Sequence, residues 1–400
     1  MRDTKNDLIL PHTHLTDLDS IEKSARVTGK MRKLALYLLA LWPTLAFSDP
    51  YTTTAKQAIL VDSTTGQILY QYNDTELMHP SSMTKIMTTY LAFDGLKSGK
   101  MSLNDRFATS EKAWKMGGSR MFLNYGDTPT IDELLKGIVV QSGNDACIVM
   151  AEGMSGDEEV FVGKMNSMAR KLGMTQTNFT NASGWPDPDN LSTAKDLSKL
   201  AIALMNNFPN LYQYHQIQKF TYGNISQSNR NLLIGKMGVD GIKTGHTDAG
   251  GYGIVLSALQ KDRRLVAVIN GLPSDKARAI EGEKILNYGF NGFTKVNLLK
   301  SDKMLAKSKI FYGELPEVSL SVKDNVQILT SNPNEKITCN IAYKDGVTAP
   351  ISLGQKLGII NCKIDNIYDS EMKYDLVAVK DVKKANFIQK IWQNIERLIS

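Results

Sequence analysis

Hydrophobic side chains recur with a helical period just after residue 80. The repeating positions are Met83, Ile86, Met87, Tyr90 and Leu91. Spacings of three and four predict an amphipathic helix, and Pro80 suits its first turn, where a missing N–H leaves no hydrogen bond unmade. Ser82 and Lys85 fall on a different stripe of this helix, and residues three apart are neighbours on a helix surface. The pattern therefore places a hydroxyl beside an amine.

Short apolar stretches predict strands on either side of this helix. Residues 57–61 and 67–70 flank the turn at 63–66 and predict a β-hairpin. Residues 254–258 and 265–269 predict two further strands, which a short polar turn joins. Because turns this short connect antiparallel neighbours, these segments predict an antiparallel sheet.

Two apolar helices are predicted between residues 130 and 150. Thr130 and Glu133 form a capping box, the side-chain pattern that starts a helix. That helix breaks at Ser142-Gly143-Asn144, and a second apolar stretch follows. A polar kink between two buried helices presents a hydroxyl and an amide at a fixed place, and a plain helix–helix turn is the alternative.

From residue 297 onward the pattern changes to short apolar–polar alternations separated by Gly, Pro and Asn. This predicts a small all-β domain at 297–381 that follows a larger domain at 49–296. Residues 382–400 predict an amphipathic helix, with Trp392 on its apolar face and lysines off it. Such a helix suits a membrane interface; docking on the β domain is the alternative.

The N-terminal region predicts a secretory signal that begins inside the chain. A basic stretch starts at Met31 and precedes an apolar run at 34–41, with a small-x-small site near Ser48. These are the three parts of a signal peptide, here residues 31–48. Residues 1–30 are polar and lack an apolar period, so we expect translation to start at Met31 and the first thirty residues to be a misassigned extension.

Length and charge narrow the classes of function. The 400 residues suggest two domains and allow a large core. The net charge of +6 comes with scattered lysines and no basic run interleaved with aromatics, so nucleic-acid binding has little support. Mild positive charge is compatible with an anionic membrane surface or a cell wall.

The cysteine and histidine content gives no sign of a metal centre or a disulfide scaffold. The chain has three cysteines, and its five histidines are scattered without metal-ligand spacing. No metal or cofactor is therefore predicted. Cys339 and Cys362 are available to pair in an oxidising compartment, while Cys147 lies in an apolar helix and is expected to be buried.

The pair Ser82 and Lys85 has a candidate chemistry. A hydroxyl becomes a nucleophile when an adjacent base takes its proton, and a lysine that is partly buried among other cations loses its proton near neutral pH. The pattern by itself is weak, since Ser-x-x-Lys also occurs at Ser20 and Ser192. An ordinary surface helix turn is therefore the alternative for this motif taken alone.

A third polar motif, Lys243-Thr244-Gly245, lies on the predicted strand before residues 254–258. Gly245 has no side chain, so another backbone can approach closely, and an extended substrate can pair with this strand as an added strand. The alternative is a polar edge strand whose lysine discourages aggregation.

Together and in this order behind a signal peptide, the three motifs resemble those of the low-molecular-mass penicillin-binding proteins, the serine-type D-alanyl-D-alanine carboxypeptidases. The likeness runs from about Asp49 to the C-terminus, with Gly143 where β-lactamases usually have Asp. It implies an α+β fold, the penicillin-binding/β-lactamase-like transpeptidase fold, in which an antiparallel sheet is flanked by helices. The small all-β C-terminal domain and the terminal helix also match the family's layout.

The resemblance implies roles for the first two motifs. Ser82 attacks the carbonyl of the penultimate D-Ala and forms an acyl-enzyme, with Lys85 as the base. Ser142 relays a proton to the departing D-Ala. Asn144 orients Ser142 and the substrate amide.

The third motif is implied to bind the substrate. Lys243 and Thr244 hold its terminal carboxylate, assisted by Arg278, and Lys243 also keeps the amine of the first motif deprotonated through like charge. Gly245 belongs to the same binding strand. The backbone N–H groups of His246 and of the nucleophilic serine hold the oxyanion.

The implied function is removal of the terminal D-Ala from peptidoglycan pentapeptide stems, with β-lactams acylating Ser82 as covalent inhibitors. The implied location is the periplasmic face of the cytoplasmic membrane, peripherally anchored by the terminal helix. A class A β-lactamase is one alternative, but its Glu-x-x-Leu-Asn pattern occurs at Glu283, after the third motif instead of before it. A non-catalytic peptidoglycan-binding protein and a DD-endopeptidase acting on cross-links are the others.

Overall fold

The computed structural model describes residues 3–9, 51–332, 336–364, 372–391 and 393. These residues form two compact units. The mixed unit consists of Thr52–Val296 with Gln327–Ser331, and the β unit consists of the described residues of Asn297–Val326 and Asn332–Ser400 with the short N-terminal strand β1 (Asp3–Ile9). The predicted signal peptide at 31–48 lies outside the described residues.

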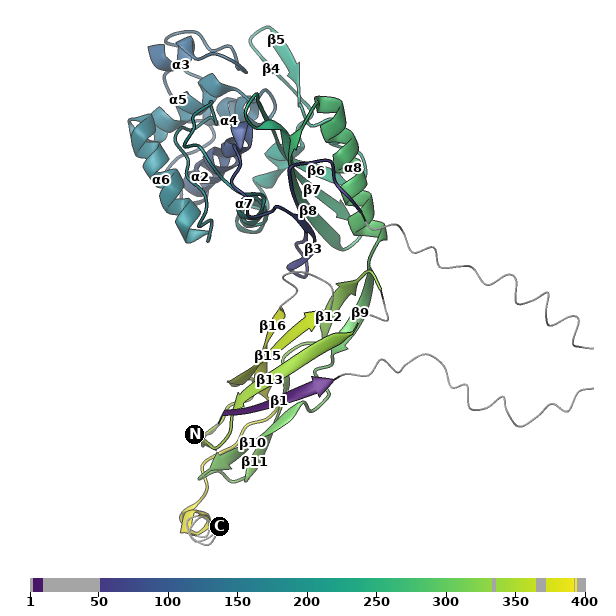
Figure 1. Ribbon diagram of the computed structural model, residues 1–400. Helices are drawn as coiled ribbons and strands as arrows, with labels where there is room; N and C mark the ends of the chain where they lie inside the picture. Colours follow the sequence, from purple (N-terminus) through teal and green to yellow (C-terminus); the bar gives the residue numbers. More distant parts are fainter. Residues whose placement is uncertain (1–2, 10–50, 333–335, 365–371, 392, 394–400) are drawn as a thin grey trace, which may run out of the picture. The chain divides into compact units, whose positions relative to one another are not determined.

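An antiparallel sheet forms the centre of the mixed unit (Figure 1). Its strands lie in the order β3 (Gln67–Tyr72), β2 (Gln57–Asp62), β8 (Arg263–Leu272), β7 (Gly251–Gln260) and β6 (Val239–Thr247). The predicted hairpin and the two later strands are thereby confirmed. Strand β6, which carries the third motif, lies at one edge of this sheet.

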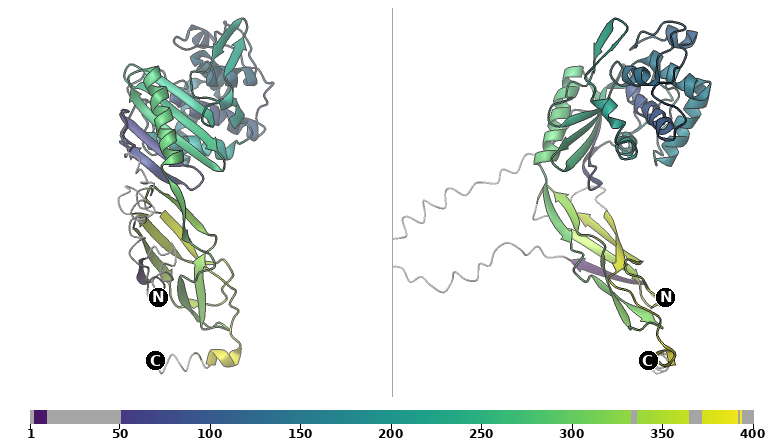
Figure 2. Two further views of the ribbon diagram at one scale, coloured as in Figure 1. Left: turned by 90° about the vertical axis from the view of Figure 1, so that its right-hand side faces the viewer. Right: turned by 180° about the vertical axis from the view of Figure 1, so that it is seen from behind.

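Helices cover both faces of the sheet (Figure 2). Helix α8 (Asp275–Asn291) packs on one face against β2, β7 and β8. The other face bears a lobe of helices that comprises α2 (Lys85–Lys97), α3 (Glu111–Lys115), α4 (Ile131–Val139), α5 (Asn144–Ser155), α6 (Glu158–Lys171) and α7 (Ala194–Asn207). Between α7 and β6 the chain forms the short helix η3 (Tyr212–Gln216) and the hairpin of β4 (Lys219–Tyr222) and β5 (Ile225–Ser228).

Helix α2 is buried on every side, which corrects the prediction of an amphipathic helix. It packs against α4, α5, α6 and α7, and its residues from Lys85 to Phe93 are all buried. Its polar residues find partners inside the protein. The Thr88 hydroxyl, for example, donates a hydrogen bond to the Ala182 carbonyl at 2.6 Å.

The β unit has the all-β architecture that the alternating pattern predicts. Its larger sheet has the strand order β1, β13 (Ile337–Lys344), β15 (Lys356–Ile364), β16 (Met372–Ala378), β11 (Glu317–Val322), β10 (Ala306–Phe311) and β14 (Val347–Thr348). A separate two-stranded sheet pairs β12 (Val326–Thr330) with β9 (Thr294–Leu299); residues 327–330 of β12 and 294–296 of β9 are counted with the mixed unit. Strand β1 pairs antiparallel with β13, and the start of translation at Met31 stays a prediction.

The chain leaves the larger sheet as an extended segment before it becomes helical. Val382 pairs with Ile351, and helical turns begin only at residue 387. Phe387 and Ile388 are 78% and 67% exposed, so this first part of the predicted helix does not bury its apolar side chains. None of the helices in the described ranges is long and apolar enough to cross a membrane.

A disulfide joins Cys339 to Cys362, which face each other on neighbouring strands β13 and β15. Cys147 is the buried free thiol that the sequence predicts. The disulfide closes a loop with a sequence separation of 23 residues. Closing a loop of this length restricts the unfolded chain and stabilises the folded state by roughly 3 kcal/mol.

Replacing both Cys339 and Cys362 by alanine is therefore expected to lower the unfolding free energy of the β unit by roughly 3 kcal/mol. Turnover of a soluble peptide is expected to stay unchanged, because the three motifs all lie in the mixed unit. Thermal unfolding followed by circular dichroism, with and without reductant, measures the effect. Identical melting curves for the variant and the oxidised wild type would contradict it.

Candidate active site

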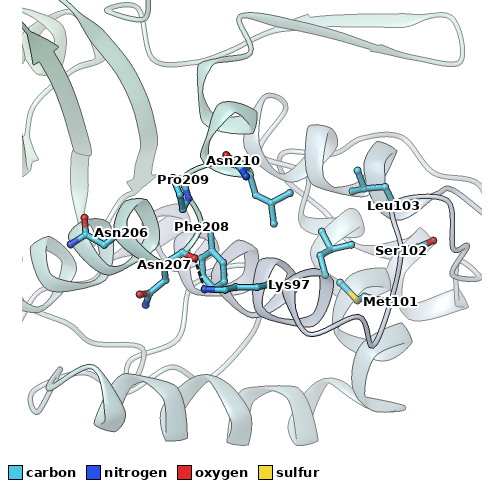
Figure 3. A pocket seen from close by; sticks show the side chains of 11 residues that line it. Lys97, Met101, Ser102, Leu103, Asn206, Asn207, Phe208, Pro209 and Asn210 are labelled. Carbon is cyan, nitrogen blue, oxygen red and sulfur yellow. Dashed lines mark hydrogen bonds between the residues drawn. The ribbon is translucent and has the colours of Figure 1, made fainter.

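Two cavities of the mixed unit are candidates for the site. One, of about 690 Å³, lies where α2 ends, beside Met101 and Phe208; Figure 3 shows Lys97 at its rim, bonded to the Asn207 carbonyl. This cavity has mostly apolar walls and lies about 18 Å along α2 from Lys85. The sequence motifs meet elsewhere.

The three motifs line a second cavity of about 420 Å³. Its polar lining contrasts with the apolar walls of the first cavity, and it lies at the beginning of α2. The lining residues are Ser82, Ser119, Ser142, Arg230, Leu232, Thr244, Gly245, His246, Tyr252, Asp275 and Arg278. We therefore take this cavity, here called the motif cavity, as the candidate active site.

The nucleophile candidate lies in a tight turn that leads into α2. Helix η2 (Ser81–Thr84) is a 3₁₀ helix, and Lys85 begins α2 directly after it. The Ser82 Oγ and the Lys85 Nζ are 2.9 Å apart. The predicted hydroxyl–amine contact is thus present, although Ser82 lies in the 3₁₀ turn rather than in the helix itself.

Lys85 makes three polar contacts, and their chemistry fixes how its amine is oriented. The Nζ atom lies 2.7 Å from the Asn144 Oδ1 and 2.6 Å from the Ser183 carbonyl oxygen. Both oxygens can only accept hydrogen bonds, so they take the two N–H groups of a neutral amine. The lone pair of that amine then faces the Ser82 hydroxyl, in the geometry that a general base requires.

Burial is the main cause of a lowered pKa at Lys85. The side chain is fully buried, and desolvation, which disfavours the ammonium, lowers its pKa to about 8; Arg230 adds a smaller effect of the same sign. The sequence analysis gave this role to the charge of Lys243. The charge of Lys243 is not the principal cause of the lowered pKa of Lys85, because desolvation has the largest effect on that pKa.

The second motif joins two helices and presents both of its polar side chains to the site. Thr130 and Glu133 form the reciprocal bonds of a capping box at the start of α4, as predicted. After α4, Ser142 adopts a positive φ of 57°, and Asn144 begins α5. The Asn144 amide also donates to the Gly117 carbonyl at 3.0 Å, which fixes the direction of its oxygen toward Lys85.

Lys243 connects the third motif to the second. Its Nζ donates to the Ser142 Oγ at 3.0 Å and to the Thr244 carbonyl at 3.1 Å. Lys243 is buried, and desolvation together with repulsion from Lys85 lowers its pKa well below the usual value. The site thus holds two buried amines, one in contact with Ser82 and the other with Ser142.

Gly245 allows the first and third motifs to approach each other. A Cβ atom at this position would lie 2.8 Å from the Pro80 carbonyl oxygen and 3.2 Å from the Met83 side chain. The sequence analysis expected a substrate backbone to use this space. The protein's own 3₁₀ turn occupies it instead, so Gly245 sets the distance between β6 and the Ser82 turn.

The Gly245→Ala variant is expected to push the Ser82 turn away from β6 and to slow acylation by a β-lactam at least about tenfold, with a loss of stability of about 1–3 kcal/mol. Gly163→Ala is the matched control, since a Cβ there meets nothing within 4 Å. Stopped-flow acylation and thermal unfolding measure the two effects. Wild-type acylation by Gly245→Ala would show that the close contact does not position the turn.

Cationic side chains gather at the far wall of the motif cavity. Arg278, which the sequence analysis named, is buried, donates to the Gly245 carbonyl at 3.3 Å and pairs with Asp275. Arg230 was missed by the sequence analysis, yet it lines the same cavity. With Thr244 and Lys243 nearby, these groups favour an anionic ligand such as a carboxylate.

The remaining predicted site residue, His246, lies at the rim of the motif cavity, with its ring 3.9 Å from that of Tyr252. All nine predicted site residues are thus in one region. Ser183 was missed because it acts through its backbone carbonyl, which no side-chain pattern can reveal. Arg230 was missed because the polar stretch before β6 has no motif of its own.

A β-lactamase-type arrangement is not found in this cavity. Among the described residues that line it, Asp275 is the carboxylate, and it pairs with Arg278. Glu158, which lies between the second and third motifs, instead bonds to Lys112 and to the Ala182 N–H. A glutamate poised to activate water for rapid deacylation is therefore absent from the lining.

Comparison with known proteins agrees with this site. Residues 44–274 match the family model of D-alanyl-D-alanine carboxypeptidases, and residues 293–384 match that of the penicillin-binding protein 5 C-terminal domain. The chain is 35% identical over 348 residues to the D-alanyl-D-alanine carboxypeptidase DacC of Escherichia coli, which covers 84% of this chain and 86% of the relative. It is 36% identical over 348 residues to DacF of Bacillus subtilis, covering 84% and 87%.

A solved structure shares the fold. The crystal structure of penicillin binding protein 5 from Haemophilus influenzae superposes with a TM-score of 0.73 at 31% identity, covering 84% of this chain and 100% of that one. The α+β fold with an all-β C-terminal domain is thereby confirmed.

Proposed function

The chain belongs to the D-alanyl-D-alanine carboxypeptidase family of serine peptidases, and from this membership we propose that Ser82 is the nucleophile that removes the terminal D-Ala from peptidoglycan stem peptides. The observation that carries the proposal is the contact of 2.9 Å between Ser82 Oγ and Lys85 Nζ. The two carbonyl partners of Lys85 direct the lone pair of its neutral form at this hydroxyl. No other described Ser-x-x-Lys copy lines the motif cavity.

Acylation begins when Lys85 takes the Ser82 proton and the oxygen attacks the carbonyl carbon of the penultimate D-Ala. The resulting oxyanion is held by the backbone N–H groups of Ser82 and His246. Collapse breaks the C–N bond to the terminal D-Ala. Ser142 gives its hydroxyl proton to the departing amine and takes one back from the Lys243 ammonium, from which it accepts a hydrogen bond. Water then hydrolyses the ester, and the Ser82 oxygen regains a proton from Lys85.

Binding of the terminal carboxylate uses the cationic wall of the cavity. Thr244, Arg230 and Arg278 line it, and the Lys243 amine donates to the Thr244 carbonyl at 3.1 Å. A bound carboxylate favours the ammonium form of Lys243, because an opposite charge raises the pKa of an amine. Substrate binding thus charges Lys243 while Lys85 remains available as the base.

Mass spectrometry of a pentapeptide muropeptide after incubation with the protein tests this function. We expect the product to be shorter by one alanine. Deacylation of a bound penicillin is expected to be slow, since no glutamate lines the cavity to activate water. An unchanged pentapeptide would overturn the carboxypeptidase activity, and rapid turnover of penicillin would favour a β-lactamase.

We also infer that the protein acts outside the cytoplasm, at the periplasmic face of the membrane. The disulfide between Cys339 and Cys362 supports this location, because disulfides persist in oxidising compartments. The exposed Phe387 and Ile388 support contact with a membrane interface. The predicted signal peptide at 31–48 supplies a route of export.

Deletion of residues 387–400 is expected to release the protein from the membrane fraction without lowering its activity on a soluble peptide. The deletion begins at 387 so that the backbone hydrogen bonds of Val382 and Ala385 to the β unit are kept. It removes the two bonds of Gln393, which accepts the Tyr312 N–H and donates to the Gly313 carbonyl, both at 2.9 Å. Fractionation followed by a penicillin-labelling assay measures both properties. Continued sedimentation of the shortened protein with membranes would contradict anchoring by this segment.

A further inference from the structure

A buried histidine, His215, lies next to the third motif but does not line the motif cavity. It belongs to η3, which packs against β6. Its Nδ1 atom lies 3.2 Å from the carbonyl oxygen of Ile242, the residue directly before Lys243. The ring therefore contacts β6 one residue away from a lysine that the proposed function uses.

Strand β6 is irregular just before Lys243. Its register with β7 shifts between Val239 and Gly241, and no strand in the described ranges pairs with its other edge. The Asn231 amide donates to the Gly241 carbonyl at 3.2 Å, and His215 contacts the carbonyl that follows. Two side chains from outside the sheet thus hold two consecutive carbonyls of the strand.

Aromatic neighbours fix the orientation of the His215 ring. It stacks on the Tyr212 ring, with the centroids 5.6 Å apart, and the Phe93 ring of α2 lies nearly perpendicular to it at 6.0 Å. Tyr212 is itself tied to β6, because its hydroxyl donates to the Asp240 Oδ1 at 3.0 Å. These contacts leave the imidazole little freedom to turn away from Ile242.

The contact with Ile242 also determines which nitrogen carries the proton. A carbonyl oxygen can only accept a hydrogen bond, so the Nδ1 atom of His215 is the donor. The buried Nε2 atom has no hydrogen-bond partner among the described residues, and a second proton there would leave a buried charge unpaired. Burial lowers the pKa of His215 to about 4 against the opposing effect of the Ile242 hydrogen bond, and repulsion from Lys243 adds to the lowering. His215 is therefore a neutral donor at neutral pH.

The Ile242 carbonyl controls the direction of the Lys243 side chain. This carbonyl and the Lys243 N–H belong to one planar peptide group, so a hydrogen bond to the carbonyl fixes the plane from which the lysine side chain starts. The Lys243 Nζ reaches the Ser142 Oγ at 3.0 Å, and a rotation of the peptide group would displace it. A neutral imidazole anchors the group without adding a charge that would disfavour the Lys243 ammonium.

We propose that His215 is a positioning residue for Lys243: its Nδ1–H holds the Ile242 carbonyl and thereby aims the Lys243 amine at Ser142 and at the carboxylate of the substrate. The proposal rests on the proposed function, because it uses the role that this function gives to Lys243. It adds a residue outside the three motifs on which recognition of the carboxylate depends.

Benzylpenicillin and its methyl ester, which lacks the free carboxylate, test the proposal. Acylation is followed by stopped flow with the ligand in excess, so that the observed rate constant does not depend on the fraction of folded enzyme. We expect the wild type to favour the free acid by about 100-fold, because the ester leaves buried cations without their partner.

His215→Leu keeps a similar volume but has no donor. It is expected to reduce the preference to about tenfold by slowing benzylpenicillin alone, since one charge-assisted hydrogen bond to the carboxylate is lost. His215→Phe, which keeps the aromatic contacts and also lacks a donor, gives the same test where the leucine variant folds poorly. His215→Asn retains an N–H near the place of Nδ1 and should restore most of the preference.

Tyr214→Phe is the matched control. Tyr214 lies beside His215 in η3, and its hydroxyl donates to the Asp132 Oδ1 of α4 at 2.6 Å. The variant therefore loses one hydrogen bond of the same short helix without touching the Ile242 carbonyl. It should keep the wild-type preference for the free acid.

The possible failures are distinguishable. A wild-type preference in His215→Leu and His215→Phe, an equal loss in Tyr214→Phe, or no recovery in His215→Asn would overturn the positioning role and leave the carboxypeptidase function intact. Equal rates with the acid and the ester in the wild type would overturn carboxylate recognition by Lys243, and the positioning role with it. Acylation of the wild type by neither ligand would overturn the proposed Ser82 acyl-enzyme itself.

Discussion

The Ser82→Ala variant is expected to take up no covalent label from a fluorescent penicillin and to release D-Ala about 10⁴-fold more slowly than the wild type, or slower still. The methyl group lacks the oxygen that we propose forms the acyl-enzyme. The cavity keeps Lys85 and the cationic wall, so the variant should still bind a peptide with a free terminal carboxylate. Gel fluorescence and a D-Ala release assay measure the two losses.

A matched control is available because the chain contains a second described Ser-x-x-Lys sequence, Ser192 to Lys195. Ser192 is fully buried, and its hydroxyl lies 2.9 Å from the Thr177 hydroxyl. Ser192→Ala therefore loses about 1 kcal/mol of stability and is expected to retain full labelling. Labelling of Ser82→Ala at the wild-type level would eliminate Ser82 as the nucleophile.

The site was predictable where the chemistry resides in side chains at fixed spacing. Ser82 and Lys85 form one such pair, and Lys243 belongs to a motif that a linear pattern can reveal. Their order along the chain made the prediction possible, and the structure brings them together. The third partner of Lys85 was not predictable, because the Ser183 carbonyl carries no residue-specific signal and is recruited only by the fold.

The fold was predictable where local chemistry determines local structure. The capping box at Thr130 and the hairpin turn, in which Asp62 accepts the Thr64 and Thr65 N–H groups, both formed as expected. The surroundings of α2 were not predictable. Its polar residues look like a solvent-facing stripe in the sequence, but Thr88 and Lys85 find internal partners, and buried polar groups with partners cannot be told from exposed ones by periodicity.

Lys85→Arg is expected to lower the rate of acylation by about 10²–10⁴-fold, the usual contribution of a general base. A guanidinium keeps its proton at any pH that the protein tolerates, so it retains the positive charge but cannot accept the Ser82 proton. Stopped-flow acylation by a β-lactam measures the rate. A variant that acylates as fast as the wild type would show that another group removes the proton.

The wild type should show the titration of Lys85 directly. Below its pKa of about 8, the amine is protonated and has no lone pair, so acylation should increase tenfold for each pH unit. Above that value the amine is neutral and the rate should level off. A rate that falls as the pH rises from 6 to 8 would contradict a neutral lysine as the base.

The Lys243→Gln variant separates the two causes of this lowered pKa. Burial is the larger cause for Lys85, so removing the charge of Lys243 is expected to leave the midpoint of the pH profile near 8 while it weakens substrate binding. Arg230→Gln should raise the midpoint slightly, because Arg230 disfavours the ammonium of Lys85. A midpoint that rises toward the ordinary lysine value of about 10.4 in Lys243→Gln would instead show that repulsion between the two amines, and not lost hydration, makes Lys85 a base.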